Sequence, residues 1–281
     1  MPKRDRYPAG VPCWIDSARP DAASAVAFYS GLLGWEMADQ MPPGSADTYF
    51  EAHLDGGLVA AIGSWDNGLP DARWTTYIAV EDTDAAAERV RAAGGRVIVD
   101  PHDVLDAGRM AMCADREGAT FAVWQANTHI GAEVVNAPGS WNWSNLITAD
   151  AASAQRFYGA VFGWEFDAME IGGARSVTVV VPEYGDYLES IDPGVRARHA
   201  AGGAPPRFTD TVAWFEPMDQ GGPRWHLTFT VADADEAATR ARALGGEVLV
   251  EPFDIPWQRI TVIRDPHGAT FTASQFKPPP A

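Results

Sequence analysis

Two side chains of this 281-residue sequence are natural candidates for acid–base chemistry. His226 lies in "RWHLTFT", an alternating stretch rich in strand-forming residues, and an imidazole ordinarily titrates near neutral pH. Asp16 lies in "PCWIDSA", and its carboxylate can hold an amine. Other interpretations stay open for both. His226 can be a hydrogen-bonded pocket histidine or a metal ligand, and Asp16 can bond to the backbone or to Arg19.

Aromatic residues share strand faces with these polar groups. Successive side chains of a strand point to opposite faces, so Trp14 shares a face with Asp16. The same alternation predicts these ligand-binding residues: Trp14, Asp16, Thr75, Tyr77, Trp124, Trp141, Trp143, Asn145, His226, Thr228 and Thr272. Aromatic walls with a few hydrogen-bonding groups suit an uncharged or cationic planar organic molecule. The alternative is that Trp14 and Trp143 fill the space as core residues.

Other catalytic signatures are absent from the sequence. It contains no GxSxG nucleophile elbow, no P-loop and no strand-linked GxGxxG. Cys13 and Cys113 fit neither a disulfide framework nor a zinc-site spacing. A reduced, cytoplasmic protein is the simple expectation.

Composition excludes several classes of partner. The formal net charge is −17, which repels phosphate backbones and argues against nucleic acid as a partner. No apolar run approaches the ~18–20 residues of a membrane-spanning helix, and the N-terminus lacks the apolar stretch of a signal peptide. We expect no membrane association. The basic stretch "PKRDR" at residues 2–6 predicts a solvated tail.

The elements that position these residues are duplicated. "FYSGLLGWE" at residues 28–36 recurs as "FYGAVFGWE" at residues 157–165, and longer matches follow at offsets near 150. The second copy therefore has an insertion at about residues 183–208, whose Gly, Pro and charged residues predict a loop. We predict a first domain at 11–126, a linker at 127–140 and a second domain at 141–276.

Each predicted domain divides again into two β-α-β-β-β modules. In the first module, residues 12–18 read as a strand, and Asp21 caps a helix whose apolar residues recur at i, i+3, i+4, i+7 and i+8. Gly34 and Gly163 are placed to end the equivalent helices of the two copies. Asp82 or Asp84 caps the helix of the second module.

With its strand and helix order repeated, the sequence resembles the vicinal oxygen chelate superfamily, which includes glyoxalase I, bleomycin-resistance proteins and extradiol dioxygenases. The resemblance rests on "DAASAVAFYSGLLGWE", "DAASAQRFYGAVFGWE", the "VxDxDxA" helix starts and the "DxxGATF" turns. Within the superfamily the chain most resembles tandem actinobacterial members often called hydroxylases. The resemblance implies an α+β fold in which paired modules form cupped mixed sheets with helices outside and ligand in the cup.

The resemblance also identifies where metal ligands would lie. Metal enzymes of the family take His, Glu or Gln ligands from inward-facing strand positions. The matching positions are Trp14, Thr75 and Ala122 in the first half, and Trp143, His226 and Thr272 in the second. An indole nitrogen only donates and cannot ligate. Glu51 and His53 lie near a fourth position. We therefore expect neither a catalytic metal nor another cofactor.

The leading hypothesis is metal-independent binding of a hydrophobic aromatic small molecule, such as an antibiotic or another natural product. It would serve sequestration, resistance or the tailoring of a natural product. The alternative is an enzyme, either a metal-free acid–base catalyst using His226 or Asp16 or a divalent-metal lyase or dioxygenase with relocated ligands. A third possibility is an interaction protein with both cups filled. Four modules in one chain are compatible with a monomer or a homodimer.

Overall fold

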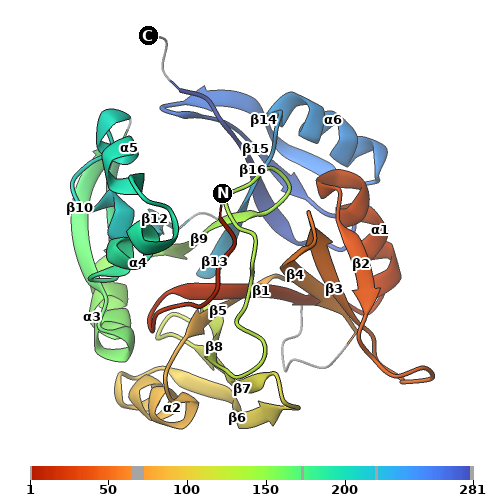
Figure 1. Ribbon diagram of the computed structural model, residues 1–281, viewed down its shortest axis with the longest axis horizontal. Coiled ribbons are helices and arrows are strands. Elements are labelled where there is room, and N and C mark those ends of the chain that lie inside the picture. The colour runs from red at the N-terminus through yellow and green to blue at the C-terminus, as the bar shows by residue number, and fades with distance from the viewer. Residues whose placement is uncertain (1, 65–72, 172–173, 219–220, 279–281) are drawn as a thin grey trace. The chain divides into compact units, whose positions relative to one another are not determined.

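The computed structural model describes residues 2–64, 73–171, 174–218 and 221–278 (Figure 1). Two eight-stranded mixed sheets confirm the predicted α+β class. Each half of the chain supplies one sheet, built from two consecutive β-α-β-β-β modules. Among the residues described, no helix is both long and apolar enough to cross a membrane.

The first sheet has the strand order β2-β3-β4-β1-β5-β8-β7-β6. Its strands are β1 (Pro12–Ala18), β2 (Glu36–Asp39), β3 (Tyr49–Leu54), β4 (Gly57–Gly63), β5 (Thr75–Ala79), β6 (Arg96–Val104), β7 (Gly108–Ala114) and β8 (Thr120–Ala126). Parallel pairing joins β1 to β4 and β5 to β8, while the pairs β2–β3, β3–β4, β6–β7 and β7–β8 are antiparallel.

The second sheet repeats this order as β10-β11-β12-β9-β13-β16-β15-β14. Its strands are β9 (Trp141–Thr148), β10 (Glu165–Ile171), β11 (Ala174–Val180), β12 (Thr211–Pro217), β13 (Arg224–Thr230), β14 (Glu247–Ile255), β15 (Gln258–Arg264) and β16 (Thr270–Phe276). The helices are α1 (Ala22–Leu33), α2 (Thr83–Ala92), α3 (Ala151–Phe162), α4 (Tyr184–Ile191), α5 (Val195–Ala201) and α6 (Ala234–Ala243).

The repeated nonapeptide forms the end of a helix and the start of the next strand, as predicted. Asp21 and Asp150 cap α1 and α3. Their side chains accept hydrogen bonds from the backbone amides of Ser24 and Ser153, at 3.1 and 2.9 Å respectively. Gly34 and Gly163 end these helices with φ of 77° and 72°, a left-handed conformation that glycine adopts without steric cost.

The insertion in the third module is not the loop that its composition predicts. It contains α4 and α5, and a short 3-10 helix, Phe208–Asp210, begins at its end. The signal lies in "YGDYLESI", where apolar residues recur at helical spacing and bury Tyr184 and Tyr187. The carboxylate of Asp210 accepts a hydrogen bond from the amide of Gly185 at 2.7 Å. A local apolar period therefore outweighs the high content of Gly, Pro and charge.

The basic N-terminal stretch is mostly exposed, as expected of a solvated tail, but it also contacts helix α4. The guanidinium groups of Arg4 and Arg6 lie over the ring of Tyr187, 5.9 and 4.8 Å from its centroid. The hydroxyl of Tyr187 donates to Asp5 at 3.0 Å. The aromatic surface of α4 thus gives the tail a partner within the same chain.

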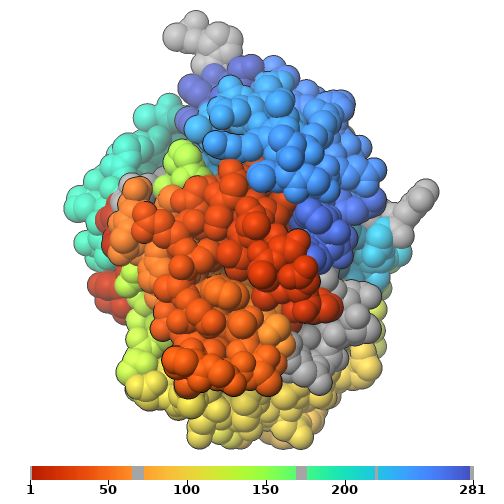
Figure 2. Space-filling view, turned by 90° about the vertical axis from the view of Figure 1, so that its right-hand side faces the viewer, coloured from red at the N-terminus to blue at the C-terminus, as the bar shows by residue number. Residues whose placement is uncertain are grey.

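The chain packs as two compact units, each of which takes elements from both halves of the sequence. Unit 1 comprises residues 1–13, 76–131 and 144–225, and within it α2 contacts α3. Unit 2 comprises residues 14–75, 132–143 and 226–281, and within it α1 contacts α6. Figure 2 shows residues of α1, in red-orange, beside those of α6, in blue. The predicted domain limits follow the sequence repeat rather than these units and stay a prediction.

A buried tyrosine organises the core of unit 2. The hydroxyl of Tyr29 accepts a hydrogen bond from Trp74 Nε1 at 2.8 Å and donates to Asp265 Oδ2 at 2.9 Å. Arg19 Nη2 lies 3.0 Å from the same oxygen, and the side chains of this ion pair are fully buried. The ring of Trp35 stacks on Tyr29 at a centroid distance of 5.6 Å. One phenol thus ties helix α1 to the turn before β16.

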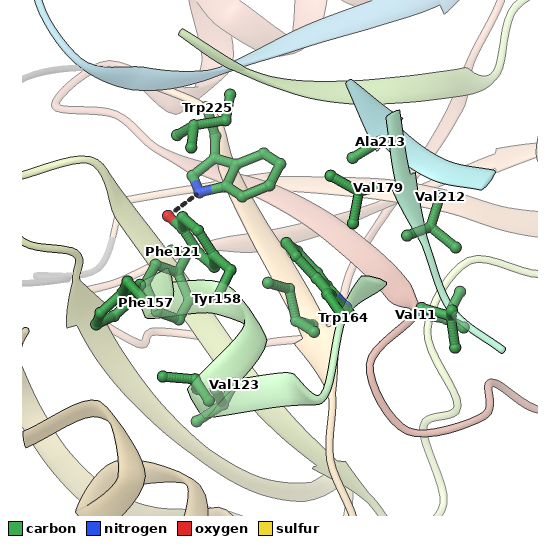
Figure 3. Close-up of a cluster of buried hydrophobic side chains, with 14 of the residues drawn as sticks. Val11, Phe121, Val123, Phe157, Tyr158, Trp164, Val179, Val212, Ala213 and Trp225 are labelled. Atoms are coloured by element: carbon green, nitrogen blue, oxygen red, sulfur yellow. Dashed lines mark hydrogen bonds between the residues drawn. The ribbon is translucent and has the colours of Figure 1, made fainter. Parts of the chain in front are cut away.

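Unit 1 repeats this network with one difference. The hydroxyl of Tyr158 accepts a hydrogen bond from Trp225 Nε1 at 3.0 Å (Figure 3). It donates to Asp115 Oδ2, also at 3.0 Å. The sequence position of Arg19 is held by Thr148, whose hydroxyl contacts Glu117. Burial raises the pKa of the Asp115 carboxyl, and hydrogen bonds from backbone amides and Tyr158 only partly offset this effect.

Replacing Asp115 with Asn tests the protonation of this buried carboxyl. Its folded-state pKa lies above the unfolded value of about 3.9, so the folded state holds the proton to higher pH. The wild type should therefore lose stability relative to Asp115→Asn as the pH rises from about 4 through the raised pKa. Urea unfolding of both proteins at pH 4 and pH 7 measures this change. A difference in unfolding free energy that is the same at both pH values would contradict it.

The matched variant in unit 2 is Asp265→Asn, which leaves the buried guanidinium of Arg19 without its counter-charge. We expect a loss of roughly 3–5 kcal/mol in unfolding free energy at pH 7, the usual cost of breaking one side of a buried ion pair. Urea unfolding at pH 7 compares the two variants. An Asp265→Asn variant no less stable than Asp115→Asn would contradict the importance of the Arg19 contact.

Candidate functional site

The first group of predicted site residues lies on one face of β1 and β3 in unit 2. Strand register aligns Asp16, Ala61 and Glu51 in one row, so the two carboxylates share a face with a small residue between them. Trp14, two residues from Asp16, donates its indole N–H to the hydroxyl of Tyr49 at 3.3 Å. This face combines acidic groups with aromatic walls.

The electrostatics of this face follow from burial beside negative charge. Burial, and then the charge of Asp16, raise the pKa of the Tyr49 hydroxyl, so it stays a neutral phenol. The pKa of Glu51 is also raised, mainly by burial. The neighbouring His53 partly offsets this effect, and the charge of Glu133 adds to it. His53 Nε2 lies 3.7 Å from the Glu51 carboxylate. Such surroundings favour a cation or a hydrogen-bond donor over an anion.

The predicted residues of the first half are nearly inaccessible. Each of these residues has less than a tenth of its surface exposed: Trp14, Asp16, Thr75, Tyr77 and Trp124. In unit 1, Tyr77 packs edge-to-face on Trp124, whose indole donates to the His129 carbonyl at 2.9 Å. Arg19, the predicted alternative partner of Asp16, forms its ion pair with Asp265. The first-half residues therefore pack like core residues.

The predicted residues of the second half are more accessible. Trp143, His226 and Thr272 in unit 2 and Asn145 in unit 1 are half-buried, whereas Trp141 and Thr228 are buried. His226 Nε2 and Thr272 Oγ1 share a hydrogen bond of 2.9 Å. Phe229 and Phe271 pack on Tyr29 at the back of the strands, so Thr228 and Thr272 lie on the opposite face. We call this the His226 face, formed by β13, β15 and β16.

Glu216 is a candidate residue that the sequence analysis missed. Asn145 Nδ2 donates to Glu216 Oε1 at 2.7 Å in unit 1, across the parallel pair β9–β12. Glu216 also lines a groove of about 450 Å³ with Thr148, Val177, Phe215 and Met218. The alternation in "TVAWFEP" is the signal that could have identified it, because Trp214 and Glu216 occupy the face opposite the buried Ala213 and Phe215.

The residues at the expected metal positions do not fit a divalent ion. The indole N–H of Trp14 already donates to Tyr49, Trp143 presents the same group, and Ala122 carries no ligating atom. Thr272 bonds to the one imidazole, His226. Across residues 2–64, 73–171, 174–218 and 221–278, no three His, Cys, Asp or Glu side chains are grouped to hold a metal ion. Zinc-type catalytic sites need three protein ligands.

Exhaustive dialysis against a chelator is expected to leave the thermal unfolding midpoint unchanged, because these residues supply too few ligands to couple an ion to folding. Differential scanning calorimetry before and after dialysis measures the midpoint. Elemental analysis that finds about one divalent ion per chain, together with a lower midpoint after its removal, would contradict this prediction.

Comparison with known proteins identifies the family of both halves. Residues 14–123 match the model of the glyoxalase/bleomycin resistance protein/dioxygenase superfamily, and residues 143–274 match the model of the glyoxalase-like domain. The chain is 40% identical to CFP32 of Mycobacterium tuberculosis, named as a glyoxylase, covering 100% of this chain and 99% of that protein. It is 37% identical to the anthracycline biosynthesis protein DnrV of Streptomyces peucetius, covering 97% and 95%.

Solved structures of low sequence identity share the fold. The Mn(II)-bound glyoxalase from Novosphingobium aromaticivorans has a TM-score of 0.58 at 13% identity, covering 95% of this chain and 82% of that one. The 2,2',3-trihydroxybiphenyl 1,2-dioxygenase from Sphingomonas wittichii has a TM-score of 0.59 at 14% identity, covering 95% and 91%. With its repeated modules, its two mixed sheets and full-length relatives, the chain belongs to the glyoxalase/bleomycin resistance protein/dioxygenase superfamily.

Proposed function

We propose that this protein binds a hydrophobic, planar aromatic natural product on the His226 face, without a catalytic metal. Binding would serve sequestration of the compound or its tailoring by other enzymes. The observation that carries the proposal is the difference between the two halves. The first-half residues are buried, whereas His226 and Thr272, which share a hydrogen bond, and Trp143 on the neighbouring strand β9 remain partly exposed.

The chemistry of this face supports an uncharged aromatic ligand. His226 and Thr272 supply a donor and an acceptor to fix the orientation of a carbonyl or hydroxyl group, and Trp143 on the neighbouring strand β9 would supply a large flat apolar surface beside them. The buried indole N–H of Trp141 on strand β9 has no hydrogen-bond acceptor among the described residues. A binding site for a polycyclic ketone or phenol needs this combination of flat surface and few polar groups.

The family relationship narrows the ligand class. Two relatives at 37% identity, DauV and DnrV, are named as anthracycline biosynthesis proteins. Anthracyclines contain fused planar rings that carry carbonyl and hydroxyl groups, which matches the groups of the His226 face. A tetracyclic anthracycline is therefore the first probe to use.

A metal-free enzyme is the second candidate, favoured by the His226–Thr272 hydrogen bond. An imidazole held by a hydroxyl has a fixed ring orientation, which general acid–base catalysis requires. In that case His226 would move a proton to or from a ligand hydroxyl. Asp16 is the weaker acid–base candidate, because its side chain is almost fully buried.

Two tryptophans at equivalent positions of the repeat provide a matched test of binding. Trp143→Ala is expected to weaken binding of a tetracyclic anthracycline by roughly tenfold or more, the typical effect of removing a contacting tryptophan. Trp14→Phe should leave the dissociation constant unchanged and lower only stability, because Trp14 is 3% exposed. Equilibrium dialysis with absorbance detection measures the dissociation constants.

The same experiment has clear contrary outcomes. If the wild-type protein shows no saturable binding to any compound of an aromatic panel, the proposed function is wrong. If Trp14→Phe weakens binding more than Trp143→Ala, the ligand occupies the first sheet instead. Product formation that His226→Ala abolishes, with binding retained, would favour the enzyme.

A further inference from the structure

An exposed aromatic pair lies at one end of the His226 face. Trp257 occupies the turn between β14 and β15, and Phe276 is the last residue of β16. Their rings are nearly parallel, at 18°, with centroids 6.4 Å apart. Trp257 is 37% exposed and Phe276 is 67% exposed. Two large apolar rings are therefore partly exposed to water, although burying them would be favourable in free energy.

Strand alternation places this pair on the same face as the polar groups. Phe276 follows Thr272 and Ser274 at alternate positions of β16, and Gln258 lies opposite Phe276 in the strand register. Ser274 donates a hydrogen bond to the Gln258 side chain at 3.0 Å. The same strand face of unit 2 thus carries His226, Thr272 and Phe276, with the buried Ser274 between the last two.

The backbone at Trp257 is unfavourable for a large side chain. Ile255 pairs with Gln258, so Pro256 and Trp257 form a two-residue turn, and Trp257 has φ of 70°. Proline followed by positive φ fits a type II turn, in which glycine is the preferred second residue. The Lys277 amide donates to the Trp257 carbonyl at 2.8 Å and fixes the turn against β16. Because stability favours glycine here, the tryptophan calls for a functional explanation.

The equivalent turn of the first half lacks the pair. Leu105 occupies it, with φ of 49° and 92% of its surface exposed, and β8 ends at Ala126. The aromatic pair therefore occurs on the sheet that has partly exposed candidate residues. It is missing from the sheet whose candidate residues are all buried. Its location follows the accessible face rather than the repeated scaffold.

We infer that Trp257 and Phe276 form a stacking subsite for a planar ring of the ligand whose polar edge reaches His226 and Thr272. This inference rests on the proposed function and specifies the length of the ligand. Thr272 and Phe276 are four residues apart, which is roughly 13 Å along a strand. A ligand that contacts both is an elongated, fused polycyclic molecule rather than a single ring.

The charges beside the pair suit an uncharged ring system. Asp254 is neutralised by two cations, because Lys277 Nζ lies 3.1 Å and Arg259 Nη1 3.1 Å from its carboxylate. The ion pairs leave no dominant charge at this end of the face. Stacking and desolvation would therefore provide most of the contact energy there.

The variant Trp257→Gly separates binding from folding. Glycine relieves the positive φ, so stability should be retained or increased, while the affinity for a tetracyclic anthracycline should fall roughly 3- to 10-fold, as loss of one aromatic contact predicts. Leu105→Gly likewise removes a large side chain from a turn residue with positive φ, in the first half, and should leave the affinity unchanged. Equilibrium dialysis and urea unfolding give the two readouts. A single-ring phenol should bind wild type and Trp257→Gly equally.

The possible results are distinguishable. Wild-type affinity in Trp257→Gly, with weakened binding in Trp143→Ala, would overturn the subsite and leave the proposed function standing. Equal losses in Leu105→Gly and Trp257→Gly would also overturn it. The pair could instead contact a second copy of the chain. Size-exclusion chromatography showing a dimer that Trp257→Gly dissociates, without any change in affinity, would assign the pair to that contact and overturn the subsite. Absence of anthracycline binding by the wild type would overturn both proposals.

Discussion

Each unit of this protein depends on a buried tyrosine hydroxyl that accepts one hydrogen bond and donates another. Tyr29 links Trp74 to Asp265, and Tyr158 links Trp225 to Asp115. Each phenol connects residues that are far apart in the sequence, such as the 236 positions between Tyr29 and Asp265. A buried hydroxyl or carboxylate without partners would cost free energy, so these contacts select one arrangement of modules. The interleaved composition of the two units follows from them.

Duplication preserved this scaffold and allowed the rest of each copy to diverge. Arg19 neutralises Asp265 in one unit, while Thr148 leaves Asp115 to hydrogen bonds alone in the other. The strand faces diverged in a related way. The candidate side chains of the first sheet are buried, whereas the second sheet has the partly exposed His226–Thr272 pair and the Trp257–Phe276 stack.

The sequence predicted the scaffold well because the scaffold is encoded locally. Helix caps at Asp21 and Asp150, the glycine ends of α1 and α3 and the alternation of β1 all depend on neighbouring residues. The insertion was mispredicted because its overall composition was given more weight than the apolar period of "YGDYLESI". The partners of Arg19 and Tyr29 could not be predicted, since they meet only after distant modules pack. The same holds for Glu216 with Asn145, where strand register creates the contact.

The most direct test is a crystal structure of the protein grown with a tetracyclic anthracycline in metal-free buffer. We predict that the fused rings lie along the His226 face, with an oxygen near His226 and Thr272 and the far ring against Trp257 and Phe276. A compound bound on the first sheet beside Trp14, or one coordinated through a metal ion at His226, would contradict this account.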